Sequence, residues 1–270
     1  MKTRIISGAV MVVALLALLL WAPDLAVAIV VGIMAAIGSY ELLYRTGLQK
    51  HVRLNIYSAV MAFVVTLWSC NGRNYAMALI GILLYYVLLF AEMMGSRAQM
   101  QFKDVMICMI SGIVMPFLLS SLIRIVVMEK GRYFVYIPFV MAFLSDTGAY
   151  FIGVFFGKHK MAPVISPKKS WEGFFGGIAT AMLGMALYAL VLEQVFGLEV
   201  RYGVALVYGL LGSLGGVFGD LTLSVVKRQT GIKDYGTLIP GHGGILDRFD
   251  SVMITAPLAE ALLLILPILV

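Results

Sequence analysis

Long apolar runs separated by short polar segments dominate this sequence. About nine runs, most of them near 20 residues, lie between charged residues, Pro or Gly, and roughly 20 apolar residues form a helix that crosses a bilayer. Apolar residues make up 61% of the chain and charged residues only 13%, which is outside the usual range of soluble domains. The sequence therefore predicts an all-α, polytopic membrane protein with about nine transmembrane helices, at residues 5–22, 24–43, 55–70, 75–93, 104–128, 133–156, 171–196, 202–226 and 251–270.

The beginning of the chain has two interpretations. Lys2 and Arg4 precede an apolar run that ends at Trp21, and the following small residues resemble the cleavage site of a secretory signal peptide. Apolar residues resume at once, however, and continue to Leu43. We therefore expect a retained first helix rather than a cleaved signal.

The distribution of basic residues predicts the orientation, because cytoplasmic loops are rich in Lys and Arg. With the N-terminus in the cytoplasm, fifteen Lys and Arg residues fall in cytoplasmic segments and four in the opposite segments. We therefore expect a cytoplasmic N-terminus, a C-terminus on the other side, and cytoplasmic loops at 157–170 and 227–250. Residues 1–130 would form an N-terminal bundle of about five helices, and residues 131–270 would form a second region that carries both polar loops.

Two aspartates inside apolar runs are candidate functional residues, since ionisable groups are costly in a membrane. Asp146 lies among short oxygen-bearing side chains in Ser145–Gly148. Asp220 ends a helix face with glycines that allow close helix packing, so its carboxylate needs a cation. The glycines on this face are Gly209, Gly212, Gly216 and Gly219. Glu41 and Glu260 also lie in apolar runs, but the sequence identifies no role for them.

Further carboxylates near Asp220 suggest a metal site. Asp247 and Asp250 share one face if the last helix begins at or before Leu246, and Asp220 and Asp247 flank the same loop. Oxygen ligands without Cys or His are typical of Mg²⁺. We therefore predict magnesium ligands among Asp146, Asp220, Asp247 and Asp250. A capped helix start with an Arg248–Asp ion pair remains the alternative for the last two aspartates.

Basic residues in the two cytoplasmic loops suggest a phosphate site. Lys168 and Lys169 precede a helix for which Ser170 is the expected N-cap, and a capped helix start with nearby cations attracts phosphate. An ordinary positive-inside loop is the alternative. The second loop combines cations, carboxylates and glycines, which together indicate phosphoryl chemistry at a membrane surface. Its basic residues are Lys227, Arg228, Lys233, His242 and Arg248.

The segment Ser224–Asp250 resembles the signature of the phosphatidate cytidylyltransferases, also called CDP-diacylglycerol synthases. It reads SVVKRQTGIKDYGTLIPGHGGILDRFD. Two upstream segments, Ser145–Tyr150 and Ser166–Gly173, also look like that family. The resemblance extends over about residues 140–253, so residues 131–270 are expected to be the catalytic region.

The resemblance implies transfer of CMP from CTP to phosphatidic acid, which gives CDP-diacylglycerol and pyrophosphate. It also implies Mg²⁺ (with a second metal ion left open), a homodimer, a bacterial-type cytoplasmic (inner) membrane, and an active site that faces the cytoplasm. Membrane lipids are expected partners, and nucleic acid is not.

Roles for individual residues follow as a hypothesis. Asp220 and Asp247 would hold magnesium against the CTP phosphates, with Asp146 and Asp250 as further ligands or supports. Arg248 and His242 would stabilise charge or position the lipid phosphate. The remaining residues would bind the triphosphate and pyrophosphate: Lys168, Lys169, Lys227, Arg228, Lys233, Gly243 and Gly244. The alternative function is a cation- or proton-coupled transporter that uses the intramembrane carboxylates.

Overall fold

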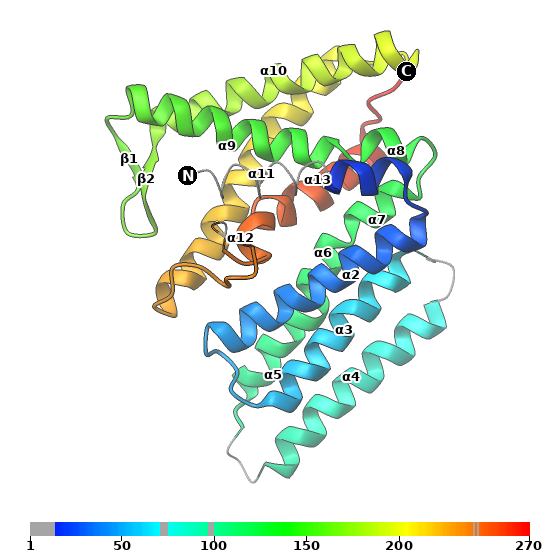
Figure 1. The fold of residues 1–270 in the computed structure, drawn as a ribbon, viewed down its shortest axis with the longest axis vertical. Coiled ribbons are helices and arrows are strands. Elements are labelled where there is room, and N and C mark those ends of the chain that lie inside the picture. Colours follow the sequence, from blue (N-terminus) through cyan, green and yellow to red (C-terminus); the bar gives the residue numbers. More distant parts are fainter. Residues whose placement is uncertain (1–13, 71–74, 97–99, 240, 242) are drawn as a thin grey trace. The chain divides into compact units, whose positions relative to one another are not determined.

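The chain forms two compact units in a computed structural model (Figure 1). The structure describes residues 14–270 except 71–74, 97–99, 240 and 242. Unit 1 comprises Met1–Met128 and Gln229–Phe249, and unit 2 comprises Glu129–Arg228 and Asp250–Val270. The segment 229–249 thus belongs by its contacts to the unit of the N-terminal helices. The functional division expected at residue 130 stays a prediction.

Unit 1 is built from long apolar helices that pack side by side (Figure 1). Helix α2 passes without a break into a π-helical turn, η1, and a second π-helical turn, η2, interrupts the span that begins with α5. Such turns widen a helix locally by one residue and often occur at functional sites. The elements are α2 (Asp24–Tyr40), η1 (Glu41–Arg45), α3 (Val52–Cys70), α4 (Tyr75–Gly95), α5 (Phe102–Met109), η2 (Ile110–Val114), α6 (Met115–Leu119), α7 (Ser121–Val126) and α12 (Leu246–Phe249).

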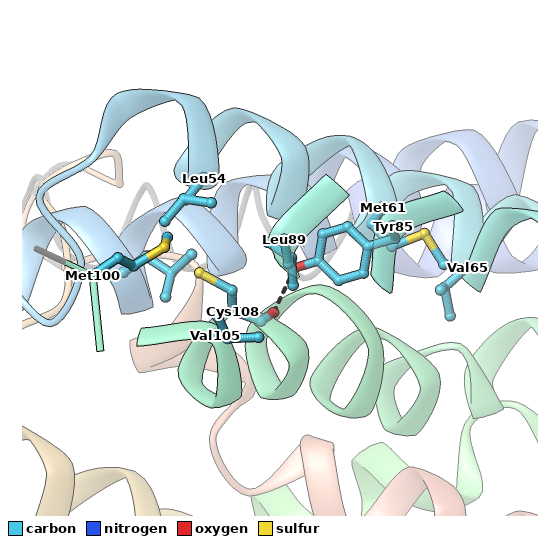
Figure 2. Packing of buried hydrophobic residues seen from close by; sticks show 9 residues of the cluster. Leu54, Met61, Val65, Tyr85, Leu89, Met100, Val105 and Cys108 are labelled. Carbon is cyan, nitrogen blue, oxygen red and sulfur yellow. Dashed lines mark hydrogen bonds between the residues drawn. The ribbon is translucent and has the colours of Figure 1, made fainter. Parts of the chain in front are cut away.

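A cluster of buried side chains joins α3, α4 and α5 in unit 1 (Figure 2). Leu54, Leu89 and Val105 are almost completely buried there. The Tyr85 hydroxyl lies in the same cluster, 2.7 Å from the Cys108 carbonyl oxygen and 2.8 Å from Ser58 Oγ. These bonds satisfy a polar group that would otherwise be costly in an apolar core.

Unit 2 is a helical bundle with a small β-hairpin. Helices α9 and α10 run side by side and are joined by the antiparallel strands β1 and β2 (Figure 1). Ser170 ends β2, and its Oγ accepts a hydrogen bond from the Gly173 N–H at 3.2 Å, which confirms the expected N-cap. The elements are α8 (Gly131–Phe134), α9 (Ile137–Phe156), β1 (Lys160–Ala162), β2 (Ser166–Ser170), α10 (Trp171–Phe196), α11 (Tyr202–Gln229) and α13 (Val252–Ile265).

The glycine face of α11 is a surface of close contact within unit 2. A Cβ atom at Gly209 would lie 2.5 Å from the Met182 Cα of α10, and one at Gly212 would collide with Met141 of α9. At Gly219 it would lie 2.5 Å from the Asp250 carbonyl oxygen. The glycines therefore let backbones approach α11 more closely than side chains would permit.

The structure confirms a nearly all-α membrane protein. In the part of the chain that the structure describes, seven helical segments are long and apolar enough to span a bilayer, from Asp24–Arg45 to Tyr202–Gln229. The predicted first span, 5–22, extends beyond the described residues, and the predicted last span contains the shorter apolar helix Val252–Ile265. The total of nine and the cytoplasmic N-terminus therefore remain predictions. The predicted polar loop 157–170 contains the β-hairpin, which is the main departure from an all-α chain.

We predict that Gly209→Ala destabilises the protein. The new methyl group meets the backbone of α10, and overpacking of this kind costs about 1–3 kcal/mol. Gly203→Ala in the same helix is the matched control, because its Cβ would meet nothing within 4 Å. Thermal unfolding in detergent should show a lower melting temperature for Gly209→Ala only. Equal melting temperatures for the two variants would contradict the close approach.

Candidate active site

Three aspartates form an acidic cluster in unit 2: Asp146 of α9, Asp220 of α11, and Asp250 just before α13. Ser251 donates its side-chain hydroxyl to Asp146 Oδ2 at 3.1 Å and its backbone N–H to Asp250 Oδ1 at 2.8 Å. Ser224, one helical turn after Asp220, donates to Asp220 Oδ1 at 3.2 Å. Serine hydroxyls thus orient Asp146 and Asp220, and a backbone N–H orients Asp250.

Lys169 supplies positive charge to the acidic cluster. Its Nζ lies 2.5 Å from Asp220 Oδ2. The ammonium nitrogen is buried and forms an ion pair with this carboxylate. Lys169 is the second-last residue of β2, so the hairpin brings its side chain to Asp220 of α11. The cation beside Asp220 in the structure is a lysine of the same unit, whereas the sequence favoured a metal ion over a lone basic side chain.

The acidic cluster changes the pKa of Asp250. Burial and the nearby charges of Asp220 and Asp146 raise its pKa from 3.8 to about 7, against the opposing effects of the Ser251 N–H and Lys227. Carboxylates gathered in a poorly solvated place disfavour one another's ionised form. A further cation in this cluster would relieve that repulsion.

The other predicted phosphate-binding residues of unit 2 occupy different environments. Lys168 is exposed, whereas Lys227 is buried on α11, two turns after Asp220. Arg228 donates from Nε to the Ile165 carbonyl oxygen at 3.0 Å. It therefore fastens the hairpin to the end of α11, a structural role that the sequence did not indicate.

In unit 1, we call the segment 231–247 the glycine loop. Its last residue, Asp247, binds backbone groups earlier in the same segment. Asp247 Oδ2 accepts backbone hydrogen bonds from Tyr235 at 2.8 Å and from Gly244 at 3.0 Å. Gly243 has a φ of 86°, which favours glycine, and a Cβ there would lie 2.8 Å from Asp247 Oδ2. Asp247 therefore holds the loop together, in addition to any contact with a ligand.

Glu41 is the functional candidate that sequence reasoning left without a role. Its two carboxylate oxygens accept the backbone N–H groups of Ile245, at 3.1 Å, and Leu246, at 3.0 Å. The available signal was a glutamate inside an apolar run together with glycines at 236 and 244, but no spacing rule connects residues about 200 positions apart.

Other predicted residues are only partly placed. Lys233 is exposed in the glycine loop, and Arg248 is partly buried on α12. Within the described part of the chain, the Arg248 Nε has no hydrogen-bond partner. His242 lies outside the described residues. Asp247 and Asp250 do not share one continuous helix, because α12 ends at Phe249 and α13 begins at Val252.

The donor set of the acidic cluster suits a hard cation such as Mg²⁺, which prefers carboxylate oxygen. As arranged, however, no group of three or more His, Cys, Asp or Glu side chains among the described residues is a ready metal site. The Lys169 ammonium lies on Asp220 Oδ2, so a metal ion at this oxygen would compete with it.

Comparison with known proteins identifies the family. The model of the Cytidylyltransferase family matches residues 2–266. The chain belongs to this family. A protein named phosphatidate cytidylyltransferase from Staphylococcus aureus strain COL is 32% identical over 98% of this chain and 99% of the relative. The protein of that name from Staphylococcus saprophyticus is 37% identical over 68% of this chain and 66% of the relative. The protein of that name from Staphylococcus epidermidis RP62A is 44% identical over 50% of this chain, a match that spans about half (51%) of the relative.

We predict that Asp250→Asn stabilises the protein at neutral and alkaline pH when divalent cations are chelated. The folded chain keeps the Asp250 proton up to about pH 7, whereas the unfolded chain loses it near 3.8. Between these values the folded state binds more protons, so wild-type stability falls as the pH rises. Asparagine cannot ionise and avoids this loss.

The measurement is thermal unfolding in EDTA from about pH 4 to about pH 8. The difference in melting temperature, Asp250→Asn minus wild type, should increase as the pH rises through this window. Asp104→Asn, which alters a helix cap in unit 1, should show no such gain. Parallel pH profiles for wild type and Asp250→Asn would contradict the assignment.

Proposed function

We propose that the protein is a phosphatidate cytidylyltransferase of a bacterial cytoplasmic membrane, which transfers CMP from CTP to phosphatidic acid. The observation that carries the proposal is family membership over residues 2–266, supported by relatives of that name aligned along 98% of the chain. The acidic cluster and its lysine add the chemistry that such a transfer needs. The transporter alternative is not favoured by these comparisons.

The reaction joins two anions, so charge neutralisation is its main requirement. A phosphate oxygen of phosphatidic acid attacks the α-phosphorus of CTP, and the bond from that phosphorus to the bridging oxygen of the β-phosphate breaks, which releases pyrophosphate. A phosphomonoester is largely dianionic at pH 7, so the attack needs no strong general base. Positioning and cations can then supply most of the catalysis.

We assign the metal to the carboxylates and the phosphates to the basic residues. Asp220 and Asp247 would hold Mg²⁺, with Asp146 and Asp250 as further ligands or supports, and the ion would supply charge neutralisation at the phosphates. Chain connectivity favours a shared site, since Asp247 and Asp250 are three positions apart and their Cα atoms lie at most about 11 Å from each other. Lys169, which pairs with Asp220 in the structure, would also supply positive charge to the triphosphate.

The remaining roles concern the substrates. Lys168, Lys227 and Lys233 would bind the triphosphate, and Gly243 and Gly244 would let backbone N–H groups approach it. Arg248 and His242 would stabilise charge or position the lipid phosphate. Arg228 would act by fixing the hairpin, in keeping with its bond to Ile165. The cytoplasmic orientation, the homodimer and a second metal ion are further parts of the proposal.

We predict that Asp220→Asn and Asp247→Asn each lower turnover by about two orders of magnitude or more, since each removes charge stabilisation in a water-poor site. Reconstituted protein with labelled CTP, phosphatidic acid and Mg²⁺ should release pyrophosphate and form a lipid-linked CMP product. Asp104→Asn is the matched control, because it makes the same chemical change at a helix cap. Near-normal turnover of both test variants, or activity independent of Mg²⁺, would contradict the metal assignment.

A further inference from the structure

Glu41 is a buried carboxylate that binds a segment far away in the sequence. It begins the π-helical turn η1 at the end of α2, and only 3% of it is exposed. Its side chain accepts the backbone N–H groups of Ile245 and Leu246 at 3.1 and 3.0 Å. These groups lie at the start of α12, where backbone donors have no partner within the helix.

Two glycines of the glycine loop make room for this carboxylate. A Cβ at Gly244 would lie 2.6 Å from the Glu41 carboxyl carbon, and one at Gly236 would lie 3.0 Å from it. Neither glycine has a positive φ, so backbone conformation does not explain why these positions lack a side chain. The space for Glu41 does explain it.

Glu41 and Asp247 hold the same short stretch from two directions. Asp247 Oδ2 accepts the N–H groups of Tyr235 and Gly244, while Glu41 accepts the next two N–H groups along the chain. Four backbone donors are thereby bound by two buried carboxylates. Hydrogen bonds to charged acceptors are about twice as strong as neutral ones, so the pair fixes the position of Asp247 and the backbone before it.

We infer that Glu41 is a positioning residue, which orients the glycine loop and Asp247 for nucleotide transfer without contacting the substrate. This inference rests on the proposed function, because it assigns Asp247 to the reaction. Simple helix packing is a poorer account of Glu41, since an apolar side chain would fill the same space without the cost of burying a charge.

The first test compares Glu41→Gln with Glu92→Gln in the full-length, reconstituted protein. An amide nitrogen cannot accept a backbone N–H, so Glu41→Gln loses one of the two bonds. Glu92 undergoes the same change in the same unit, but its partners are the Tyr57 hydroxyl and Arg53. We expect kcat/KM for CTP to fall by about 10- to 100-fold in Glu41→Gln, as for other residues that orient a ligand, with KM for phosphatidic acid nearly unchanged. Glu92→Gln should resemble the wild type.

Hydrogen exchange gives a readout that does not depend on activity. The amides of residues 245 and 246 should exchange faster in Glu41→Gln than in the wild type or Glu92→Gln, while the other helices keep their protection. If wild-type protein made no lipid-linked CMP, the proposed function would fail, whereas the exchange result would still report the contact. Faster exchange with an unchanged kcat/KM would overturn the positioning role, and so would unchanged exchange.

A second perturbation acts on the other side of the contact, and its single variant leaves Glu41 unchanged. Gly244→Ala keeps the carboxylate but displaces it, so it should lower kcat/KM by about tenfold or more in the wild-type background. In a Glu41→Ala background the same change should cost much less, because the group that the methyl meets is gone. Equal losses in the two backgrounds would overturn the inference, as would normal activity of Gly244→Ala.

Discussion

The ion pair between Lys169 and Asp220 is the interaction on which the candidate site of unit 2 depends. Asp220 lies at the end of the glycine face of α11, where neighbouring backbones approach closely and its side chain is only 23% exposed. A carboxylate in such a place is costly unless a cation accompanies it. The β-hairpin supplies that cation, and the bond from Arg228 to Ile165 fixes the hairpin. Fold and electrostatics are therefore coupled through a few side chains.

Buried carboxylates in unit 1 also need compensation, and there it comes from the backbone. The carboxylates of Asp247 and Glu41 accept hydrogen bonds from backbone N–H groups of the glycine loop, which compensate for their burial. Glycines at 236, 243 and 244 leave the space for these carboxylates. The cost of burying the acids is thus offset by hydrogen bonds from four backbone N–H groups, and a backbone fixed in this way can help to position a nucleotide.

Much of this organisation could be predicted from local sequence. The apolar runs indicated the spans because their length matches a bilayer, and Ser170 was recognisable as an N-cap from its place before an apolar helix. The need of Asp220 for a cation followed from its glycine neighbours. Relations across long sequence distances were not accessible. Nothing in the residue spacing linked Glu41 to Leu246, and the hairpin that carries Lys169 had no strong alternation of polar and apolar residues.

The metal remains the central proposal, and its most direct test is a crystal structure of the wild-type protein with CTP and Mn²⁺ in place of Mg²⁺. The account predicts an anomalous scattering peak with carboxylate oxygens of both Asp220 and Asp247 at about 2.0–2.2 Å. A peak that lacks either aspartate would contradict it.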